Sequence, residues 1–155
     1  MEKTNVMRLL DAAKLAYTPH EYPATQAVSG TEVARMLGIN EERVFKTLVT
    51  IGASKRNYVF VIPVAAELSL KKAAQAAGEK SIEMIKSKEL LPLTGYVHGG
   101  CSPIGMKKTF PTFVDEQVIL CDSIVFSAGK IGYQVEMSPQ SLGEIVEYRV
   151  CDVTM

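Results

Sequence analysis

Hydrophobic positions near the start of the chain recur at the spacing of a helix. Four apolar side chains share one face of residues 5–13, namely Val6, Leu9, Leu10 and Ala13. Thr4 precedes them and can cap this helix. After an extended segment at residues 17–22, a second helix is predicted, because Ser29 and Glu32 form a capping-box pair and Gly38 supplies a C-terminal stop.

β-Forming residues then replace the helical pattern. Residues 44–51 and 58–64 are rich in β-branched and aromatic side chains, and the polar link between them predicts a hairpin. The second strand is apolar almost throughout, which is typical of a central strand buried on both faces. Lys46 interrupts the apolar character of the first strand.

The middle of the chain returns to helices and turns. The Ala- and Lys-rich segment 70–77 ends at Gly78 and predicts a helix, whereas residues 87–91 predict a single helical turn before Pro92. Residues 95–105 follow, and they contain the highest density of turn-forming residues in the chain.

The last third of the chain predicts short strands and one more helix. The strands are expected at residues 109–114, 118–120, 123–127, 132–136 and 147–151. The helix begins after Ser138, with Pro139 at its first position. Because helices and hairpins alternate irregularly, we expect an α+β fold with a mixed, mostly antiparallel sheet and a single domain over residues 1–155.

Composition narrows the class of protein. A chain of 155 residues with 47% hydrophobic residues can bury one substantial core. Its 17 basic and 17 acidic residues give a formal net charge of zero, which argues against a protein that coats nucleic acid. Any contact with a nucleic acid would therefore use a local patch and weaken as salt rises. With no signal peptide or membrane-spanning run, we expect a cytoplasmic protein without a membrane partner.

The cysteines and histidines do not predict a metal site. Cys101, Cys121 and Cys151 are widely spaced, and His20 lies far from His98 in sequence. A structural zinc site needs clustered ligands, and disulfides are rare in a reducing compartment. We expect neither a metal nor a cofactor.

Lys46 is the first candidate for chemistry. Alternation along the strand gives it the same face as Val44 and Leu48, where its three N–H donors would serve a carbonyl or phosphate oxygen in a cleft. A place on the solvated face of a half-buried strand is the alternative. The glycine-rich segment Gly99 to Gly105 is the second candidate, since its amides can approach an anion closely. An ordinary tight connection between strands would also explain it.

Two weaker candidates remain. Ser127 to Gly132 is explained by a hairpin turn unless Ser127 or Lys130 faces the same cleft as Lys46. Cys101 in the glycine-rich segment is a candidate nucleophile, although most cysteines are small buried hydrophobes and neither histidine forms a recognisable triad with it.

Several of these segments occur together, in one order, in a known family. The chain resembles the YbaK/EbsC family, which includes Cys-tRNA(Pro) deacylases and is related to the editing domain of some prolyl-tRNA synthetases. The segments that carry the resemblance are Val44–Leu48, Pro63–Val64, Leu70–Lys72, Thr94–Lys108 and Ser127–Lys130. The chain departs from the family pattern at Ala128, Ile131 and Gln134, where relatives often have Gly, Arg and an acidic residue.

The resemblance implies a partly barrel-like sheet and a set of site residues. Lys46 matches the family's essential lysine and is the implied catalytic residue. The implied substrate-binding residues are Tyr22, Gly99, Gly100, Cys101, Ser102, Pro103, Gly105, Ser127, Gly129 and Lys130. Lys46 would anchor the phosphate or sugar of the 3′-terminal adenosine, and the amides of the loop would lie near the ester carbonyl.

The resemblance also implies a reaction and partners. The chain would hydrolyse the ester of a mischarged aminoacyl-tRNA in trans, with Cys-tRNA(Pro) as the leading substrate and the substrate's own thiol as the nucleophile. Positioning would then be the main contribution of the enzyme. The partners are the acceptor end of aminoacyl-tRNA and, as a candidate, prolyl-tRNA synthetase. Editing of alanine or another small amino acid with an activated water, and a non-catalytic aminoacyl-tRNA-binding role, are the alternatives.

Overall fold

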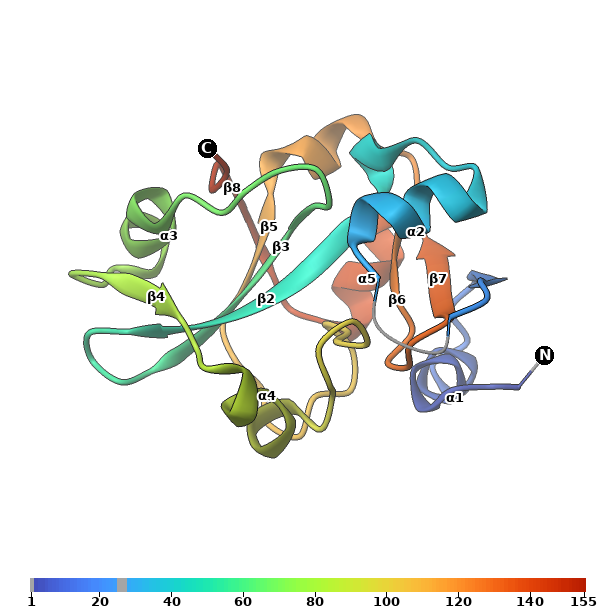
Figure 1. Cartoon of the computed structure of the whole chain (residues 1–155), viewed down its shortest axis with the longest axis horizontal. Helices are drawn as coiled ribbons and strands as arrows, with labels where there is room; N and C mark the ends of the chain where they lie inside the picture. The colour runs from blue at the N-terminus through green and yellow to red at the C-terminus, as the bar shows by residue number, and fades with distance from the viewer. Residues whose placement is uncertain (1, 25–27) are drawn as a thin grey trace.

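Two β-sheets form the centre of the computed structural model, which describes residues 2–24 and 28–155 (Figure 1). The larger sheet has the strand order β4-β2-β3-β5-β8, with β2 (Phe45–Gly52), β3 (Asn57–Pro63), β4 (Ile82–Met84), β5 (Thr112–Asp115) and β8 (Arg149–Cys151). The smaller sheet has the order β1-β7-β6, with β1 (Thr18–Glu21), β6 (Ile124–Ser127) and β7 (Tyr133–Met137). β5 pairs in parallel with β3 and β8, whereas the other pairs are antiparallel.

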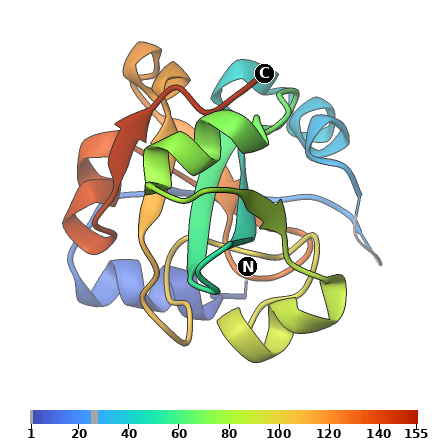
Figure 2. The ribbon, with the colours of Figure 1, turned by 90° about the vertical axis from the view of Figure 1, so that its left-hand side faces the viewer.

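Helices surround the two sheets. They are α1 (Asn5–Ala12), α2 (Gly30–Leu37), α3 (Leu70–Ala77), α4 (Ser87–Thr94), α5 (Pro139–Ile145) and the 3-10 helices η1 (Glu41–Arg43) and η2 (Glu116–Leu120). The predicted caps are confirmed: the Thr4 side chain accepts a hydrogen bond from the Met7 amide, and Ser29 and Glu32 form a capping box. α3 lies across the larger sheet beside the C-terminal segment (Figure 2). The α+β prediction is confirmed.

Both predicted hairpins are present, and they determine where the core lies. β3 pairs with β2 on one side and β5 on the other, and its residues 58–63 are all buried, as expected for a central strand. β2 and the smaller sheet meet at a parallel bridge between Val44 and Val125. Over residues 2–24 and 28–155, the two sheets are joined there but do not close into a barrel. One large apolar cluster, which includes Phe45 and Phe126, fills the space between them.

Two local predictions were wrong. Residues 118–120 form part of η2 rather than a strand, because the Asp115 carboxylate accepts a hydrogen bond from the Gln117 amide and starts a 3-10 turn. Residues 87–91 do not end at Pro92, since α4 continues to Thr94. The proline removes one N–H donor only, and the Gly95 amide still closes the last turn on the Leu91 carbonyl at 2.9 Å.

Two strands also begin later in the chain than predicted. β5 begins at Thr112 rather than at residue 109, and β8 begins at Arg149 rather than at residue 147. Among residues 2–24 and 28–155, the helices are all too short or too polar to span a bilayer.

Candidate active site

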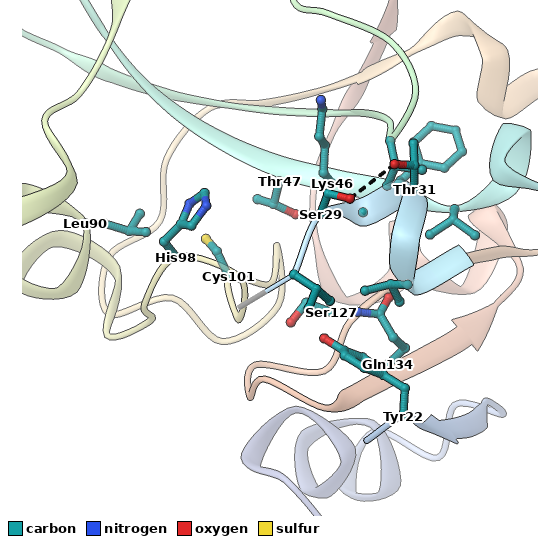
Figure 3. A pocket seen from close by; sticks show the side chains of 17 residues that line it. Tyr22, Ser29, Thr31, Lys46, Thr47, Leu90, His98, Cys101, Ser127 and Gln134 are labelled. Carbon is teal, nitrogen blue, oxygen red and sulfur yellow. Dashed lines mark hydrogen bonds between the residues drawn. The ribbon is translucent and has the colours of Figure 1, made fainter. Parts of the chain in front are cut away.

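A cavity of about 340 Å³ lies where the two sheets meet, beneath the start of α2. This volume falls in the range of small-molecule sites. Its described lining comes from both sheets, α2, α4 and the glycine-rich loop: Tyr22, Val28, Ser29, Gly30, Thr31, Val33, Val44, Phe45, Lys46, Thr47, Val64, Leu90, His98, Gly99, Cys101, Ser127 and Gln134. Figure 3 shows ten of these side chains with labels.

The smaller sheet gives the cavity a neutral polar wall. Ser127 at the end of β6 is paired in register with Gln134 in β7, so both side chains stand side by side on one face. Tyr22 follows β1, and its amide donates to the Gly132 carbonyl at 2.9 Å. Tyr22, Ser127 and Gln134 gather on one side of the cavity in Figure 3.

β2 gives the cavity two adjacent polar residues that point in different directions. Lys46 extends away from Ser127 and Gln134 in Figure 3, whereas Thr47 lies on the inner side of the strand. Burial lowers the pKa of Lys46, and the nearby carboxylate of Glu67 offsets part of that effect. No ion pair joins Lys46 to another described residue. The sequence places this ammonium on a mostly apolar strand, and the fold leaves its donors free for a ligand.

Thr47 was not predicted from the sequence. Its Oγ1 is buried and is the one such side-chain oxygen or nitrogen in the described part of the chain that lacks a hydrogen-bond partner. A buried hydroxyl without a partner destabilises the fold and needs an explanation. Its place on the cavity wall offers one, since a bound ligand can supply the missing partner.

The glycine-rich loop contributes fewer residues to the cavity than predicted. Gly99 and Cys101 line it, whereas Gly100, Ser102, Pro103 and Gly105 do not. Ser102 is fully buried, and its Oγ accepts a hydrogen bond from the Ile104 amide, which holds the loop in shape.

The amides of the loop are only partly available. The Gly100 N–H donates to the Val97 carbonyl at 2.9 Å, so it is occupied within the loop. The amides of Gly99 and Cys101 make no hydrogen bond to any residue the structure describes. Because both residues also line the cavity, their N–H groups are the loop donors open to a ligand there.

The turn after β6 contributes Ser127 alone. Gly129 lies against the Tyr96 ring, outside the cavity lining. Lys130 is exposed, forms an ion pair with Glu2, and stands 5.3 Å from the centre of the Tyr133 ring. Five of the predicted site residues therefore line the cavity together: Tyr22, Lys46, Gly99, Cys101 and Ser127.

Cys101 does not have the properties of a nucleophile. Burial raises the pKa of its thiol to about 12, so the thiol stays protonated near neutral pH. His98 also lines the cavity, but the structure shows no hydrogen bond between its ring and the buried Cys101 sulfur. Cys101 therefore acts as an apolar wall residue in this arrangement.

Several lining residues could not be recognised from sequence. Ser29 appeared only as a helix cap and Gln134 only as a departure from a family pattern, while Thr31 and Leu90 carried no signal. No group of three or more His, Cys, Asp or Glu side chains suited to a metal ion occurs in the described ranges.

Comparison with known proteins identifies the family. The family profile described as "Aminoacyl-tRNA editing domain" matches residues 24–145. An Enterococcus faecalis (strain ATCC 700802 / V583) protein named "Putative Cys-tRNA(Pro)/Cys-tRNA(Cys) deacylase EbsC" is 43% identical over 154 residues, covering 99% of this chain and 94% of that protein.

Solved structures share the fold. One described as "a putative trans-editing enzyme for prolyl tRNA synthetase" aligns with a TM-score of 0.83 at 22% identity, over 100% of this chain and 99% of that one. Another, described as "hypothetical protein APE2540", aligns with a TM-score of 0.87 at 24% identity, over 98% and 100%. The chain belongs to the aminoacyl-tRNA editing family and, within it, to the YbaK/EbsC group of aminoacyl-tRNA hydrolases.

Proposed function

We propose that the chain removes a wrongly attached amino acid from tRNA in trans, and that its substrate is Cys-tRNA(Pro). The observation that supports this best is the cavity itself: a lysine without an ion-pair partner stands on one side, and a neutral polar wall stands on the other. The named deacylase relative at 43% identity supports the choice of a cysteinyl ester.

Lys46 is proposed to hold the tRNA rather than the amino acid. Its side chain leads away from Ser127 and Gln134, so its three N–H donors suit the phosphate or ribose of the terminal adenosine at that side of the cavity (Figure 3). The aminoacyl group then extends toward the small-sheet wall. The free amides of Gly99 and Cys101 are the proposed donors to the ester carbonyl as negative charge develops on its oxygen.

None of the described lining residues forms a pair of base and nucleophile, which fits substrate-assisted chemistry. The cysteinyl thiol, after losing its proton, would attack the carbonyl carbon of its own ester. The C–O bond to the ribose would break, the leaving oxygen would take up a proton, and a thiolactone would be released for hydrolysis in solution. The protein would contribute by holding thiol, carbonyl and ribose in place.

This substrate also implies the partners of the protein and the compartment in which it acts. Aminoacyl-tRNA is the partner, and prolyl-tRNA synthetase is the proposed source of the mischarged tRNA. The site of action is then the cytoplasm. The net charge of zero favours delivery of the tRNA by such a partner over tight binding by the isolated chain.

The direct test measures release of amino acid from Cys-tRNA(Pro) and Ala-tRNA(Pro) by the wild type and Lys46→Ala. Lys71→Ala, on the exposed side of α3, is the matched control for loss of a lysine. We expect rapid release of cysteine only, lost in Lys46→Ala and kept in Lys71→Ala. Release of alanine instead would indicate a water nucleophile, and no release from either tRNA would contradict Cys-tRNA(Pro) as the substrate.

A further inference from the structure

The described lining of the cavity contains no carboxylate. Among the described lining residues, Lys46 is the only Asp, Glu, Lys or Arg, and His98 would add a second positive charge if it were protonated. A positively charged ligand group therefore finds no ionic partner on these walls. Moving such a group from water into the cavity would leave its charge uncompensated, which is costly.

Gln134 stands at the centre of the neutral wall. Gln134 is 6% exposed and lines the cavity, and its side-chain carboxamide forms no hydrogen bond to any described residue. The adjacent Ser127 Oγ accepts a hydrogen bond from the Gly129 amide at 3.1 Å, so its own O–H remains free to donate. Together the two side chains offer donors and one amide oxygen acceptor to a ligand.

The charged groups near the cavity do not change the character of this wall: Glu67 acts on Lys46, and the Glu32 carboxylate accepts hydrogen bonds from Ser29. Glu136 lies two residues along β7 and on the same strand face, but its carboxylate is occupied by His20, Arg43 and Ser123. Lys46 extends to the opposite side of the cavity, and the buried thiol of Cys101 is neutral. Tyr22 contributes a phenol.

We propose that Gln134 and Ser127 bind the α-amino group of the aminoacyl ester as an uncharged amine, and that Gln134 is the residue that sets this preference. The inference rests on the proposed function. A free amine has two N–H donors for the Gln134 amide oxygen and one lone pair for the Ser127 O–H. An ammonium group has no lone pair, and a Gln offers it no opposite charge.

The preference has a measurable consequence. α-Amino groups have pKa values of about 7.7–8.0, so below that range binding must release the substrate's proton. Affinity should then fall about tenfold for each pH unit below the amine's pKa, because the binding-competent form becomes tenfold rarer.

The experiment uses an adenosine carrying alanine through a 3′-amide, which cannot be hydrolysed like the ester and has no thiol. Calorimetric titration at pH 6 in buffers of different ionisation enthalpy counts the protons released on binding. We expect about one proton per molecule bound by the wild type. A propionyl analogue, which lacks the amine, should release none and controls for titration of Lys46 or His98.

Two variants sharpen the test. Gln134→Glu keeps the shape and adds a carboxylate, so proton release should fall toward zero and affinity at pH 6 should rise about tenfold. Gln134→Met keeps the size without a polar group, so it should weaken binding while the release of about one proton persists.

Binding of the alanyl analogue at pH 6 without proton release would overturn the inference and leave the deacylase function intact. If neither analogue binds tightly enough to titrate, rates of hydrolysis provide the test. The kcat/KM of Gln134→Glu divided by that of the wild type should then be about tenfold higher at pH 6 than at pH 8.5. A ratio that stays constant with pH would contradict the inference. Absence of hydrolysis of any aminoacyl-tRNA would contradict the proposed function separately.

Discussion

The Tyr96 ring packs so closely against Gly129 that a Cβ on this glycine would lie 2.8 Å from Tyr96 Cε1. The Tyr96 hydroxyl donates a hydrogen bond to the Ile104 carbonyl in the glycine-rich loop. Tyr96 thereby ties that loop to the turn after β6, and the two segments carry the cavity residues Cys101 and Ser127. The structure thus gives this glycine a packing role outside the cavity lining.

Gly129→Ala should therefore destabilise the fold. The residue has φ +88°, and an added Cβ would also lie 3.0 Å from Val6 Cγ2. Strain and overpacking together should cost about 2–4 kcal/mol, measured as the free energy of unfolding in urea. Gly78→Ala is the matched control, because Gly78 has φ +72° but open space around it. Equal losses in the two variants would show that the Tyr96 contact is unimportant.

Cys101→Ser should keep kcat/KM for deacylation within about threefold of the wild-type value. A thiol that takes no part in the reaction contributes little to stabilising the transition state, so its removal costs little. The physical reason is that burial raises the pKa of this thiol to about 12, so the thiolate is scarce at neutral pH. The measurement is kcat/KM on the aminoacyl-tRNA that the wild type hydrolyses. A decrease in kcat/KM of a thousandfold or more would indicate that Cys101 is a nucleophile after all.

Lys46→Met should abolish deacylation without lowering stability. Burial lowers the pKa of Lys46, so folding disfavours its charged form, and this penalty applies at every pH below the folded-state pKa. An apolar side chain of similar length removes the penalty, so the melting temperature at pH 7 should stay equal or rise. Lys71→Met, on an exposed part of α3, should change neither property. A melting temperature that falls would assign Lys46 a structural role.

Glu136→Gln should change the pH dependence of stability. Burial raises the pKa of Glu136, but hydrogen bonds from Ser123, His20 and Arg43 outweigh it and lower the pKa from 4.5 to about 2. A lowered carboxyl pKa stabilises the fold above pH 4.5, and this stabilisation is lost as pH falls toward 2. The upper limit is roughly 3 kcal/mol at pH 7.

Urea unfolding at pH 7, 4 and 3 checks this expectation, and the gap between wild type and Glu136→Gln should shrink as the pH falls. Glu144→Gln, on the exposed side of α5, is the control and should leave the wild-type profile unchanged. A gap that remains constant with pH would mean that the carboxylate charge at Glu136 does not stabilise the fold.

Thr47→Val should separate stability from substrate binding. The Thr47 Oγ1 is buried without a partner, so replacing it with a methyl group of similar shape should raise the free energy of unfolding by about 1 kcal/mol. If a substrate supplies the missing partner, KM should rise about five- to tenfold at the same time. Unchanged KM together with higher stability would show that no ligand reaches this hydroxyl.

Local sequence signals were sufficient for most elements of the fold. The Thr4 cap, the Ser29–Glu32 capping box and the β2–β3 hairpin depend on hydrogen bonds and backbone angles within a few residues, and these are encoded where they occur. η2 was not predicted, because the Asp115 carboxylate accepts a hydrogen bond from the Gln117 amide within a run of β-forming residues. The motifs around Lys46 and the glycine-rich loop were also sufficient to indicate the family.

Only the tertiary structure decided which of these residues share a cavity. The glycine-rich loop looked uniform in sequence, yet Gly99 and Cys101 face the cavity while Ser102 is buried beneath it. Lys130 seemed equivalent to Ser127, but it points to solvent and pairs with Glu2. A cavity wall depends on how two sheets distant in sequence are packed together, and that packing is a property of the whole core rather than of any local pattern.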